Sequence, residues 1–328
     1  MKKNYFITGG TGSFGQKFVE VLIKKKLAKK IIIFSRDEFK QLKLKEKDFV
    51  KKNKKIFRFY IGDVRDKSRL DWAMHDDIDV VIHSAALKQV PTTEYNPFET
   101  VKTNVLGSQN LIEMCIKKNI DKTLLISTDK AVSPINLYGA TKLTAEKLTI
   151  SANIFKGKRK CKFSVVRYGN VMGSRGSVIP LLIDQNMKKN SPFTITDKRM
   201  TRFNITLDQA SDLVLNCLNK MKGKEVFVPK LPSYNIITLA KSINSKKKIK
   251  IIGIRKGEKI HEELISSADL LNCKEYKDHY IIYPLENFVV NKKISKFSDS
   301  YNSFSNKVYL QTTDLKKLIK IQSKNFEK

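Results

Sequence analysis

The chain has 328 residues, of which 41% are hydrophobic, and this is typical of a globular protein with a well-buried core and one or two domains. Its formal net charge is +32, but the lysines are spread along the chain without interleaved aromatic residues, which argues against nucleic acid as a partner. The lack of an 18-residue apolar run argues against a membrane span, and four scattered cysteines without metal-ligand spacing indicate reduced thiols in a cytoplasmic protein without a metal site.

Short segments rich in β-branched residues alternate with longer helical patterns in the first half of the chain. The first segment starts too close to the N-terminus to leave room for a signal peptide. The alternation predicts an α/β fold with a doubly wound parallel sheet, the Rossmann fold, over residues 1–168. The predicted strands are 5–8, 31–35, 57–62, 80–84, 123–127 and 163–167, and the predicted helices are 12–25, 38–52, 68–74, 97–118 and 138–156.

The second half of the chain is less regular and richer in turns. It predicts a smaller substrate-binding lobe, formed by residues 169–200 and 228–285, over the carboxyl edge of the sheet, where ligands bind in such folds. Residues 201–227 are expected to pack back on the first domain. Residues 286–328 show few periodic signals and are expected to form a peripheral tail.

A glycine-rich loop joins the first predicted strand to the first predicted helix. Its glycines form the pattern G-x-x-G-x-x-G, which allows a tight turn, close approach of the backbone to a pyrophosphate, and close packing of helix against strand. The N–H groups and the dipole at the helix N-terminus favour the same anion. The loop therefore predicts dinucleotide binding, with contacts from Gly9, Thr11, Gly12, Ser13, Phe14 and Gly15.

The end of the second predicted strand indicates which dinucleotide binds. Arg36 directly follows this strand and Lys40 lies about one helical turn further on, and a guanidinium suits the 2′-phosphate of NADP. Asp37 leaves NAD as an alternative, because a carboxylate at this place accepts a hydrogen bond from the ribose 2′-OH. The pattern favours NADP, with contacts from Ser35, Arg36, Asp37, Glu38 and Lys40.

Two further strand ends are predicted to contact the cofactor. Asp63 and Val64 follow the third strand, where a carboxylate is expected to bind the adenine amine; the alternative for Asp63 is an N-cap before Arg65. Ser84 and Ala85 follow the fourth strand and are small enough for the cofactor to lie along the backbone. These residues extend the predicted cofactor site along the edge of the sheet.

The predicted chemistry is concentrated in residues 127–142. Tyr138 and Lys142 have the Tyr-x-x-x-Lys spacing, which places both on one helix face, where the ammonium is expected to lower the pKa of the phenol. The phenol then serves as an acid/base for a substrate hydroxyl. Asp129 and Lys130 follow the fifth strand, and such a second pair is needed only if the reaction also breaks a C–H and a C–O bond. The alternative is a surface turn with two solvated charges.

Together these motifs resemble the extended short-chain dehydrogenases/reductases that act on nucleotide sugars, and among them the inverting UDP-N-acetylglucosamine 4,6-dehydratases of the pseudaminic acid pathway. The Asp129-Lys130 pair makes the resemblance specific, since retaining sugar dehydratases have Asp-Glu there and epimerases have small or hydroxyl residues. The chain departs from the family pattern at Ser84, Gln89 and Lys256. The matching segments are 8–15, 35–40, 62–66, 85–91, 102–107, 127–142, 167–180, 200–203 and 254–264.

The resemblance implies NADP-dependent dehydration of UDP-N-acetylglucosamine at C4 and C6 with inversion at C5, the first step of pseudaminic acid or related surface-sugar biosynthesis. Tyr138 is expected to take the proton of the 4-OH, and Lys142 to hold the nicotinamide ribose. Lys130 is expected to remove the C5 proton as a neutral amine, its pKa depressed by partial burial or by Lys142. Asp129, with a raised pKa, is expected to protonate the departing 6-OH.

The resemblance also implies the residues that contact the substrate and the assembly of the protein. A homo-oligomer, a dimer or higher, is expected, with the helices at 97–118 and 138–156 as contact surfaces. Either Ser127 or Thr128 completes a triad with Tyr138 and Lys142, and the sequence leaves both open. The expected substrate contacts are Lys88, Thr128, Asn170, Val171, Arg175, Ser177, Arg202 and Arg255, whose arginines suit a diphosphate.

Two kinds of alternative function remain open from sequence. A UDP-sugar 4-epimerase or a retaining 4,6-dehydratase would use the same cofactor and the same Tyr138/Lys142 pair. A non-catalytic NADP-binding regulator is expected to have lost that pair, which is intact in this chain. The sequence favours the inverting dehydratase.

Overall fold

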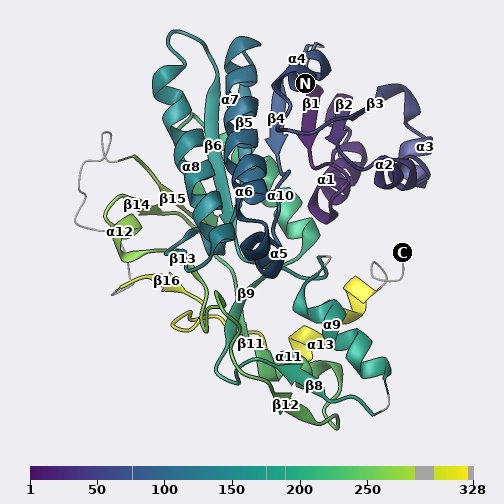
Figure 1. The fold of residues 1–328 in the computed structure, drawn as a ribbon, viewed down its shortest axis with the longest axis vertical. Helices are drawn as coiled ribbons and strands as arrows, with labels where there is room; N and C mark the ends of the chain where they lie inside the picture. Colours follow the sequence, from purple (N-terminus) through teal and green to yellow (C-terminus); the bar gives the residue numbers. More distant parts are fainter. Residues whose placement is uncertain (76, 175, 189, 285–298, 324–328) are drawn as a thin grey trace.

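The computed structural model describes residues 1–75, 77–174, 176–188, 190–284 and 299–323, and it is built around a nine-stranded sheet (Figure 1). The strand order is β14-β15-β10-β6-β5-β4-β1-β2-β3, with parallel pairing from β10 to β3 and two antiparallel strands at the β15 edge. The bounds are β1 (Lys3–Thr8), β2 (Ala28–Ser35), β3 (Phe57–Ile61), β4 (Val80–His83), β5 (Lys122–Thr128), β6 (Lys162–Tyr168), β10 (Val226–Pro229), β14 (Cys273–Glu275) and β15 (His279–Ile282). The predicted doubly wound sheet is confirmed.

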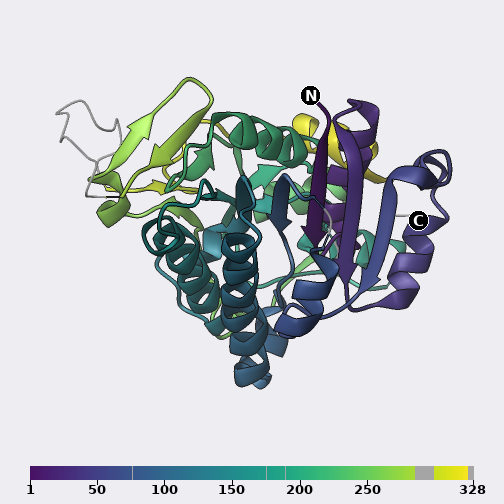
Figure 2. The same cartoon turned by 90° about the horizontal axis from the view of Figure 1, so that it is seen from above.

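Helices cover both faces of this sheet (Figure 2). Two of them, α1 and α10, pack against each other on one face, where Lys17 and Asp208 form an ion pair at 2.9 Å. The other face carries α4, α7 and α8, and α7 packs against both neighbours. The bounds are α1 (Ser13–Lys24), α4 (Lys67–Ala73), α7 (Gly107–Lys117), α8 (Leu137–Phe155) and α10 (Leu207–Lys220).

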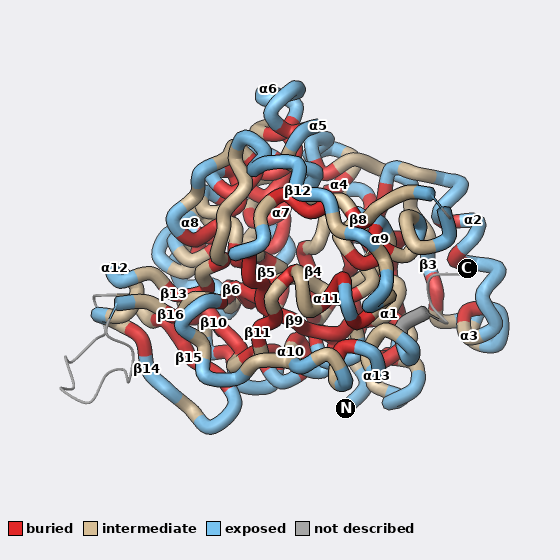
Figure 3. The backbone as a smooth tube through the Cα atoms, turned by 90° about the horizontal axis from the view of Figure 1, so that it is seen from below, coloured by how far each residue is buried: buried red, intermediate tan, exposed pale blue. Residues whose placement is uncertain are grey.

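The hydrophobic core forms because the strands alternate their side chains between these two layers. In β1, Tyr5 and Ile7 are buried in the cluster that includes Phe18 of α1, whereas Phe6 between them is buried in the cluster that includes Leu111 of α7. A period of two is what a strand requires when it is covered on both faces. Figure 3 shows the resulting buried centre, with the exposed segments at the periphery.

Two predicted helices are interrupted in the structure. The segment predicted as one helix at 38–52 forms α2 (Glu38–Lys45) and α3 (Asp48–Lys51), followed by the short helix η1 (Lys54–Ile56). The segment predicted as one helix at 97–118 forms α6 (Pro97–Val101), a π-helical turn η2 (Lys102–Leu106) and α7, and the unpredicted α5 (Val90–Tyr95) precedes it. The hydrophobic periodicity of the sequence does not show the break at η2, because the chain stays helical through a π-turn.

The remaining elements form a smaller lobe at the carboxyl edge of the sheet, as Figure 1 shows. It contains a three-stranded sheet of order β11-β9-β7 and a two-stranded sheet of β12 and β8, packed with α9 and α11. The bounds are β7 (Asn170–Val171), β8 (Phe193–Ile195), β9 (Thr201–Ile205), β11 (Ser233–Asn235), β12 (Ile249–Ile251), α9 (Val178–Met187) and α11 (Ile236–Ile243).

The segment after residue 298 differs from the peripheral tail that was predicted. Its strand β16 (Tyr301–Asn302) pairs with β13 (Glu263–Ile265), which α12 (Ser267–Leu270) follows, and Tyr301 is buried. The last helix, α13 (Thr312–Ser323), packs on α11 and buries Leu315. Leu310, Leu318 and Ile319 are partly buried against the same cluster as Leu315, and Asn306 donates to the carbonyl of Leu231 at 2.7 Å. Residues 285–298 and 324–328 of the expected tail lie outside the described residues.

Among the described residues, no helix combines the length and the apolar character that crossing a membrane requires.

Candidate active site

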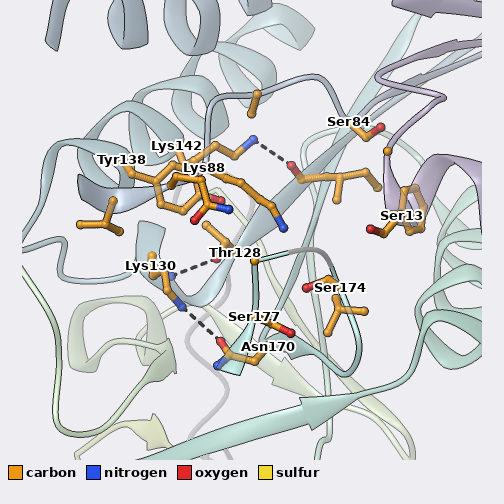
Figure 4. Close-up of a pocket in the computed structure, with 18 of the residues that line it drawn as sticks. Ser13, Ser84, Lys88, Thr128, Lys130, Tyr138, Lys142, Asn170, Ser174 and Ser177 are labelled. Atoms are coloured by element: carbon orange, nitrogen blue, oxygen red, sulfur yellow. Dashed lines mark hydrogen bonds between the residues drawn. The ribbon is translucent and has the colours of Figure 1, made fainter. Parts of the chain in front are cut away.

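A cleft of about 1010 Å³ lies between the carboxyl edge of the main sheet and the smaller lobe. Its walls come from the ends of β1, β2, β4 and β5 on one side and from the segments around β7, α9 and residues 255–262 on the other. Figure 4 shows side chains from both sides, among them Ser13, Tyr138 and Ser177, lining the same space. The cleft is where a doubly wound sheet binds its ligands.

Most of the residues predicted for the site line this cleft. Two described residues do not: Glu38 is exposed in the first turn of α2, and Asp129 is fully buried next to Lys130. Arg175 lies outside the described residues. The lining residues that were predicted are Gly9, Thr11, Gly12, Ser13, Phe14, Gly15, Ser35, Arg36, Asp37, Lys40, Asp63, Val64, Ser84, Ala85, Lys88, Thr128, Lys130, Tyr138, Lys142, Asn170, Val171, Ser177, Arg202 and Arg255.

The glycine-rich loop has the shape that a dinucleotide requires. Gly9 has φ +67°, and a Cβ atom there would lie 2.8 Å from the backbone nitrogen of Ala85, so only glycine fits. Gly12 is the N-cap of α1 and, lacking a side chain, supplies no capping group to the first N–H groups of the helix. The loop thus presents backbone amides to the cleft at a helix N-terminus, which suits a pyrophosphate.

The charged residues after β2 have two different roles: Asp37 caps helix α2, and Arg36 places its guanidinium at the cleft. Asp37 is the N-cap of α2: its Oδ1 accepts from the backbone N–H of Lys40 at 2.9 Å, and its Oδ2 pairs with Lys40 Nζ at 2.7 Å. Glu38 follows this cap as the first helical residue, which explains its exposure. Arg36 is half exposed and lies 3.6 Å from Asp63.

The N-cap alternative for Asp63 is wrong. The N-cap of α4 is Asp66, whose Oδ1 accepts from the backbone N–H of Arg69 at 2.8 Å. Asp63 instead accepts from the backbone N–H and from Nε of Arg65, both at 2.9 Å, and lines the cleft.

Tyr138 and Lys142 lie on the cleft side of the first turns of α8, both buried. Asn136 caps this helix by accepting from the N–H of Gly139 at 2.8 Å, which fixes the start of α8. Burial lowers the pKa of Lys142 to about 8, and its Nζ donates to the carbonyl of Ile126 at 2.8 Å. Burial raises the pKa of Tyr138 to about 12, against the Lys130 charge and a hydrogen bond with Thr128. Lys130, rather than the predicted Lys142, is the ammonium that acts on the phenol.

The Asp129-Lys130 turn packs directly against α8. It forms the short helix η3 (Asp129–Ala131), and a Cβ atom at Gly139 would lie 2.1 Å from the Lys130 carbonyl oxygen, so only glycine allows this approach. Asp129 is 0% exposed. The alternative of a surface turn with solvated charges is therefore wrong.

Lys130 is surrounded by oxygen atoms. Its Nζ lies 3.0 Å from Asp129 Oδ1 and 3.2 Å from Glu262 Oε1, and it donates to Asn170 Oδ1 at 3.2 Å (Figure 4). Burial acts to lower the pKa of Lys130, but the two carboxylates outweigh it and hold the pKa above its ordinary range. The prediction of a depressed pKa for Lys130 is thus wrong for the free protein, because that prediction did not include the carboxylate of Glu262.

The pKa of Asp129 is raised, as was predicted. Burial raises its pKa above the ordinary range, with Lys130 acting in the opposite direction and Glu262 adding to the rise. Its Oδ1 accepts from the hydroxyl of Thr128 at 2.8 Å, and its buried Oδ2 has no hydrogen-bond partner among the described residues. Thr128 lines the cleft, so it connects Asp129 to the space that Asp129 does not reach.

The two candidates for the triad hydroxyl have different surroundings. Ser127 donates to Glu146, whose carboxylate is also paired with Arg167 at 2.6 Å in the interior behind α8. Both residues line the cleft, but Thr128 is the one that hydrogen-bonds Tyr138. The arrangement favours Thr128 as the triad hydroxyl.

Arg202 is less available for a diphosphate than was predicted. Its Nη1 donates to the carbonyl oxygens of Thr201 at 2.8 Å and Ile260 at 2.9 Å, and its Nη2 donates to that of Lys259 at 2.9 Å. Its Nε lies 3.5 Å from Glu262 Oε1. These bonds hold the segment around residue 260 against β9, so Arg202 positions other groups of the site. Arg255 and Lys88 also line the cleft.

Two residues of the site were missed by sequence reasoning. Glu262 lies in a motif used for the resemblance, but only the fold brings it beside Lys130. Asn104, in the π-turn η2, accepts from the backbone N–H of Leu87 at 2.8 Å and donates to its carbonyl at 2.9 Å, and so fixes the segment next to Lys88. The interruption of a helix by a π-turn is a recurrent mark of functional sites, but the sequence does not display it.

Comparison with known proteins shows the family of the chain and several similar proteins. The chain matches the family described as "Polysaccharide biosynthesis protein" over residues 5–284. It is 45% identical over 333 residues to a "UDP-N-acetylglucosamine 4,6-dehydratase (inverting)" from Campylobacter jejuni, with 97% of each chain covered. It is 41% identical over 332 residues to a "UDP-glucose 4-epimerase" from Rickettsia canadensis, with 97% of this chain and 95% of the other covered.

A solved structure is similar over nearly the whole chain. It is the X-ray structure of Pen from Bacillus thuringiensis, which superposes with a TM-score of 0.88 at 38% sequence identity. The match covers 98% of this chain and 99% of the other, so it includes the smaller lobe and not only the dinucleotide-binding sheet.

Proposed function

Because the chain belongs to the polysaccharide biosynthesis protein family of extended short-chain dehydrogenases/reductases, we propose that it dehydrates UDP-N-acetylglucosamine at C4 and C6 with inversion at C5. The product is UDP-2-acetamido-2,6-dideoxy-β-L-arabino-hex-4-ulose, a precursor for pseudaminic acid or a related surface sugar. The observation that carries the proposal is the ion pair between buried Asp129 and Lys130, which lines the cleft with Tyr138.

The cofactor of this reaction is NADP, bound along the glycine loop and the ends of β2 to β4. When bound, it takes up a hydride from the substrate and later returns it. Both oxygens of Asp37 are engaged by Lys40, which disfavours a bond from Asp37 to a ribose hydroxyl. The guanidinium of Arg36 at the cleft suits a 2′-phosphate instead.

Replacing Arg36 by alanine is expected to weaken NADP binding selectively. A hydrogen bond to a charged group contributes about 1.5–3 kcal/mol, which corresponds to an increase of roughly 10- to 100-fold in the Kd for NADP. The Kd for NAD should stay nearly constant. Titration calorimetry with both dinucleotides measures this difference, with Lys43→Ala as the control, because Lys43 is an exposed cation of α2 that does not line the cleft. An equal loss for both dinucleotides would remove Arg36 from its assigned role.

Oxidation at C4 depends on Tyr138. Its phenolate takes the proton of the 4-OH, and although burial raises the pKa of Tyr138 to about 12, the Lys130 ammonium and the Thr128 hydroxyl favour the phenolate. Lys142 holds the nicotinamide ribose from the next turn of α8. In this step Lys130 therefore acts as an ammonium.

Elimination depends on a proton shared by Lys130 and Asp129. Lys130 passes a proton from Nζ across 3.0 Å to Asp129, which leaves a neutral amine and a carboxylic acid. The amine then takes the C5 proton, and the C–H electron pair moves into the enolate of the C4 ketone. The acid proton of Asp129 reaches the departing 6-OH through the Thr128 hydroxyl, and water leaves. Lys130 and Asp129 end this step as the ammonium and carboxylate with which they began. The hydride would then return to C6 while C5 takes a proton on the opposite face, and this uptake balances the proton that Tyr138 took from the 4-OH.

The substrate diphosphate lies near the start of α9 and the segment at 255–262. Ser177 is the N-cap of α9, and its buried hydroxyl has no hydrogen-bond partner among the described residues, so it is available to an oxygen of the substrate. The half-exposed Arg255 and the side chain of Lys88 supply positive charge at the cleft. Val171 supplies an apolar wall.

Incubation with UDP-N-acetylglucosamine in deuterated water, followed by NMR, tests the function. The expected product is a 4-keto, 6-deoxy sugar that carries deuterium at C5 and has the L-arabino configuration. Retained configuration at C5 would exclude the inverting mechanism. If no UDP-sugar is turned over, the proposed function is wrong.

The second candidate function is 4-epimerisation, the activity for which the Rickettsia relatives are named. An epimerase needs Tyr138 and Lys142 but no group that acts on C5 or C6. The ion pair of Lys130 with buried Asp129 therefore favours dehydration. The same NMR experiment separates the two functions, because epimerisation keeps the 6-OH and dehydration creates a C6 methyl group.

We also propose a homo-oligomer with contacts beside α7 and α8. Tyr95, Phe98 and Leu106 are large apolar residues in the segments that lead into α7, and all three are exposed in the single chain. A second copy that covers them would remove this apolar surface from water.

A further inference from the structure

A second carboxylate, that of Glu262, lies beside Lys130. The residue directly precedes β13, and its side chain is only 3% exposed. Its Oε1 lies 3.2 Å from Lys130 Nζ and 3.5 Å from Arg202 Nε, and its backbone N–H donates to Ser303 Oγ at 2.9 Å. Glu262 is thus held at both its side chain and its backbone, and it lines the cleft.

Lys130 is faced by charged or titratable groups from five parts of the fold. Among the described residues, the carboxylates in ion-pair contact with its Nζ are Asp129 and Glu262. Arg202 and Lys259 bring positive charge from β9 and from the segment before Glu262. Tyr138 of α8 and Tyr234 of β11 lie within electrostatic reach of Lys130. Glu262 is therefore the one negative charge near Lys130, among these residues, that the proposed elimination does not use.

We propose that Glu262 sets the pH range in which the Asp129–Lys130 pair holds the single proton that elimination requires. This inference rests on the proposed function. Elimination works when the pair carries one shared proton, either on Lys130 or on Asp129. With two protons Lys130 cannot become a base, and with none Asp129 cannot act as an acid, so the rate follows a bell-shaped pH profile. Glu262 acts through Lys130 and is a positioning residue.

The charge of Glu262 has the same effect on both limbs of this profile. Burial acts to raise the pKa of Glu262, but Lys130 and Arg202 outweigh it and keep the pKa below its ordinary range, so Glu262 stays a carboxylate. A fixed negative charge stabilises the Lys130 ammonium and disfavours the Asp129 carboxylate. Each group therefore loses its proton at a higher pH than it would without Glu262, and the whole active range moves towards alkaline pH.

Replacing Glu262 by glutamine is expected to move both limbs of the pH profile of kcat to lower pH. A neighbouring charge at this distance changes a pKa by about 1–3 units, and the shift of each limb should lie in that range. Glu262→Asp keeps the charge at a longer distance and should give a smaller shift. If Glu262→Gln does not fold, the Glu262→Asp profile is the test, and it should shift in the same direction. A variant that only lowers the rate, with both limbs in place, would overturn the proposal.

A control variant and a second measurement separate this inference from the proposed function. Glu263→Gln makes the same chemical change one residue further on, at a carboxylate that accepts from Ser133 Oγ at 2.8 Å and does not line the cleft, and it should leave both limbs in place. Competitive labelling of Lys130 with an amine reagent at a series of pH values reports its pKa without substrate. Glu262→Gln should lower that pKa, whether or not the protein turns over a UDP-sugar. An unchanged pKa of Lys130 would overturn the inference, whereas an inactive wild type would overturn only the function.

Discussion

Replacing Lys130 by arginine is expected to lower kcat for dehydration by about 10²- to 10⁴-fold, the usual contribution of a general base. Arginine keeps the positive charge between Asp129 and Glu262, but its guanidinium does not lose a proton in proteins and thus never becomes the free amine that takes the C5 proton. The variant isolates the proton transfer from the ion pairs. Stopped-time NMR of the product measures dehydration, and exchange of deuterium into C5 measures the proton step itself.

Methionine at position 130 is the complementary variant. It removes both the amine and the charge, which leaves two carboxylates without their cation and is expected to lower stability as well as activity. Thermal unfolding and NADP affinity show whether the fold persists, and Lys147→Met on the exposed side of α8 controls for loss of a lysine. Lys130→Arg keeps the charge that favours the Tyr138 phenolate and should still oxidise C4, so the absorbance of reduced nicotinamide should build up after substrate is added. Lys130→Met lacks that charge and should oxidise C4 more slowly. Full dehydration by Lys130→Arg would refute the base assignment.

The parts of the site that were predicted correctly depend on local sequence. The glycine loop, the strand ends and the spacing of Tyr138 and Lys142 each follow from the geometry of one strand, turn or helix, which short sequence patterns encode. The alternation of Tyr5, Phe6 and Ile7 between two core layers likewise follows from the geometry of a single strand. These features gave the fold class and most of the residues that line the cleft.

The parts that were missed depend on contacts between distant segments. Asp129 and Glu262 both raise the pKa of Lys130. Glu262 lies far along the chain, and the segment that carries it is held in place by Arg202. For the same reason Arg202 was predicted to bind a diphosphate, although backbone carbonyls already occupy its guanidinium. Sequence shows that a charged residue is present, but only the fold shows which partner it has.

Asp129 illustrates how both kinds of information combine. Asp129 is adjacent to Lys130 in the sequence, and in the fold Lys130 Nζ lies 3.0 Å from Asp129 Oδ1. The contact does not disable the pair, because burial raises the pKa of Asp129 and makes it an acceptor for the proton of Lys130. An ion pair in the free protein is thus compatible with an acid and a base during elimination.

Replacing Tyr138 by phenylalanine is expected to stop the reaction one step earlier than the Lys130 variants do. Phenylalanine keeps the ring packed against the cleft but lacks the oxygen that takes the 4-OH proton, so kcat should fall by about 10²- to 10⁴-fold. Because C4 is not oxidised, no reduced nicotinamide should build up, and C5 should not exchange with deuterated water. This is the opposite of the build-up expected for Lys130→Arg.

In the wild-type protein, the rate of C4 oxidation should depend on pH through the ionisation of Tyr138. Burial raises the pKa of Tyr138 to about 12 in the free protein, so the phenolate fraction, and with it the rate of C4 oxidation, should rise with pH through the neutral range. Rapid mixing with substrate at a series of pH values measures this rate from the nicotinamide absorbance. Thr128→Val should lower it, because valine removes the hydroxyl that favours the phenolate. If Tyr138→Phe oxidises C4 at the wild-type rate, another group accepts the proton, and the order of steps that places Tyr138 before Lys130 is wrong.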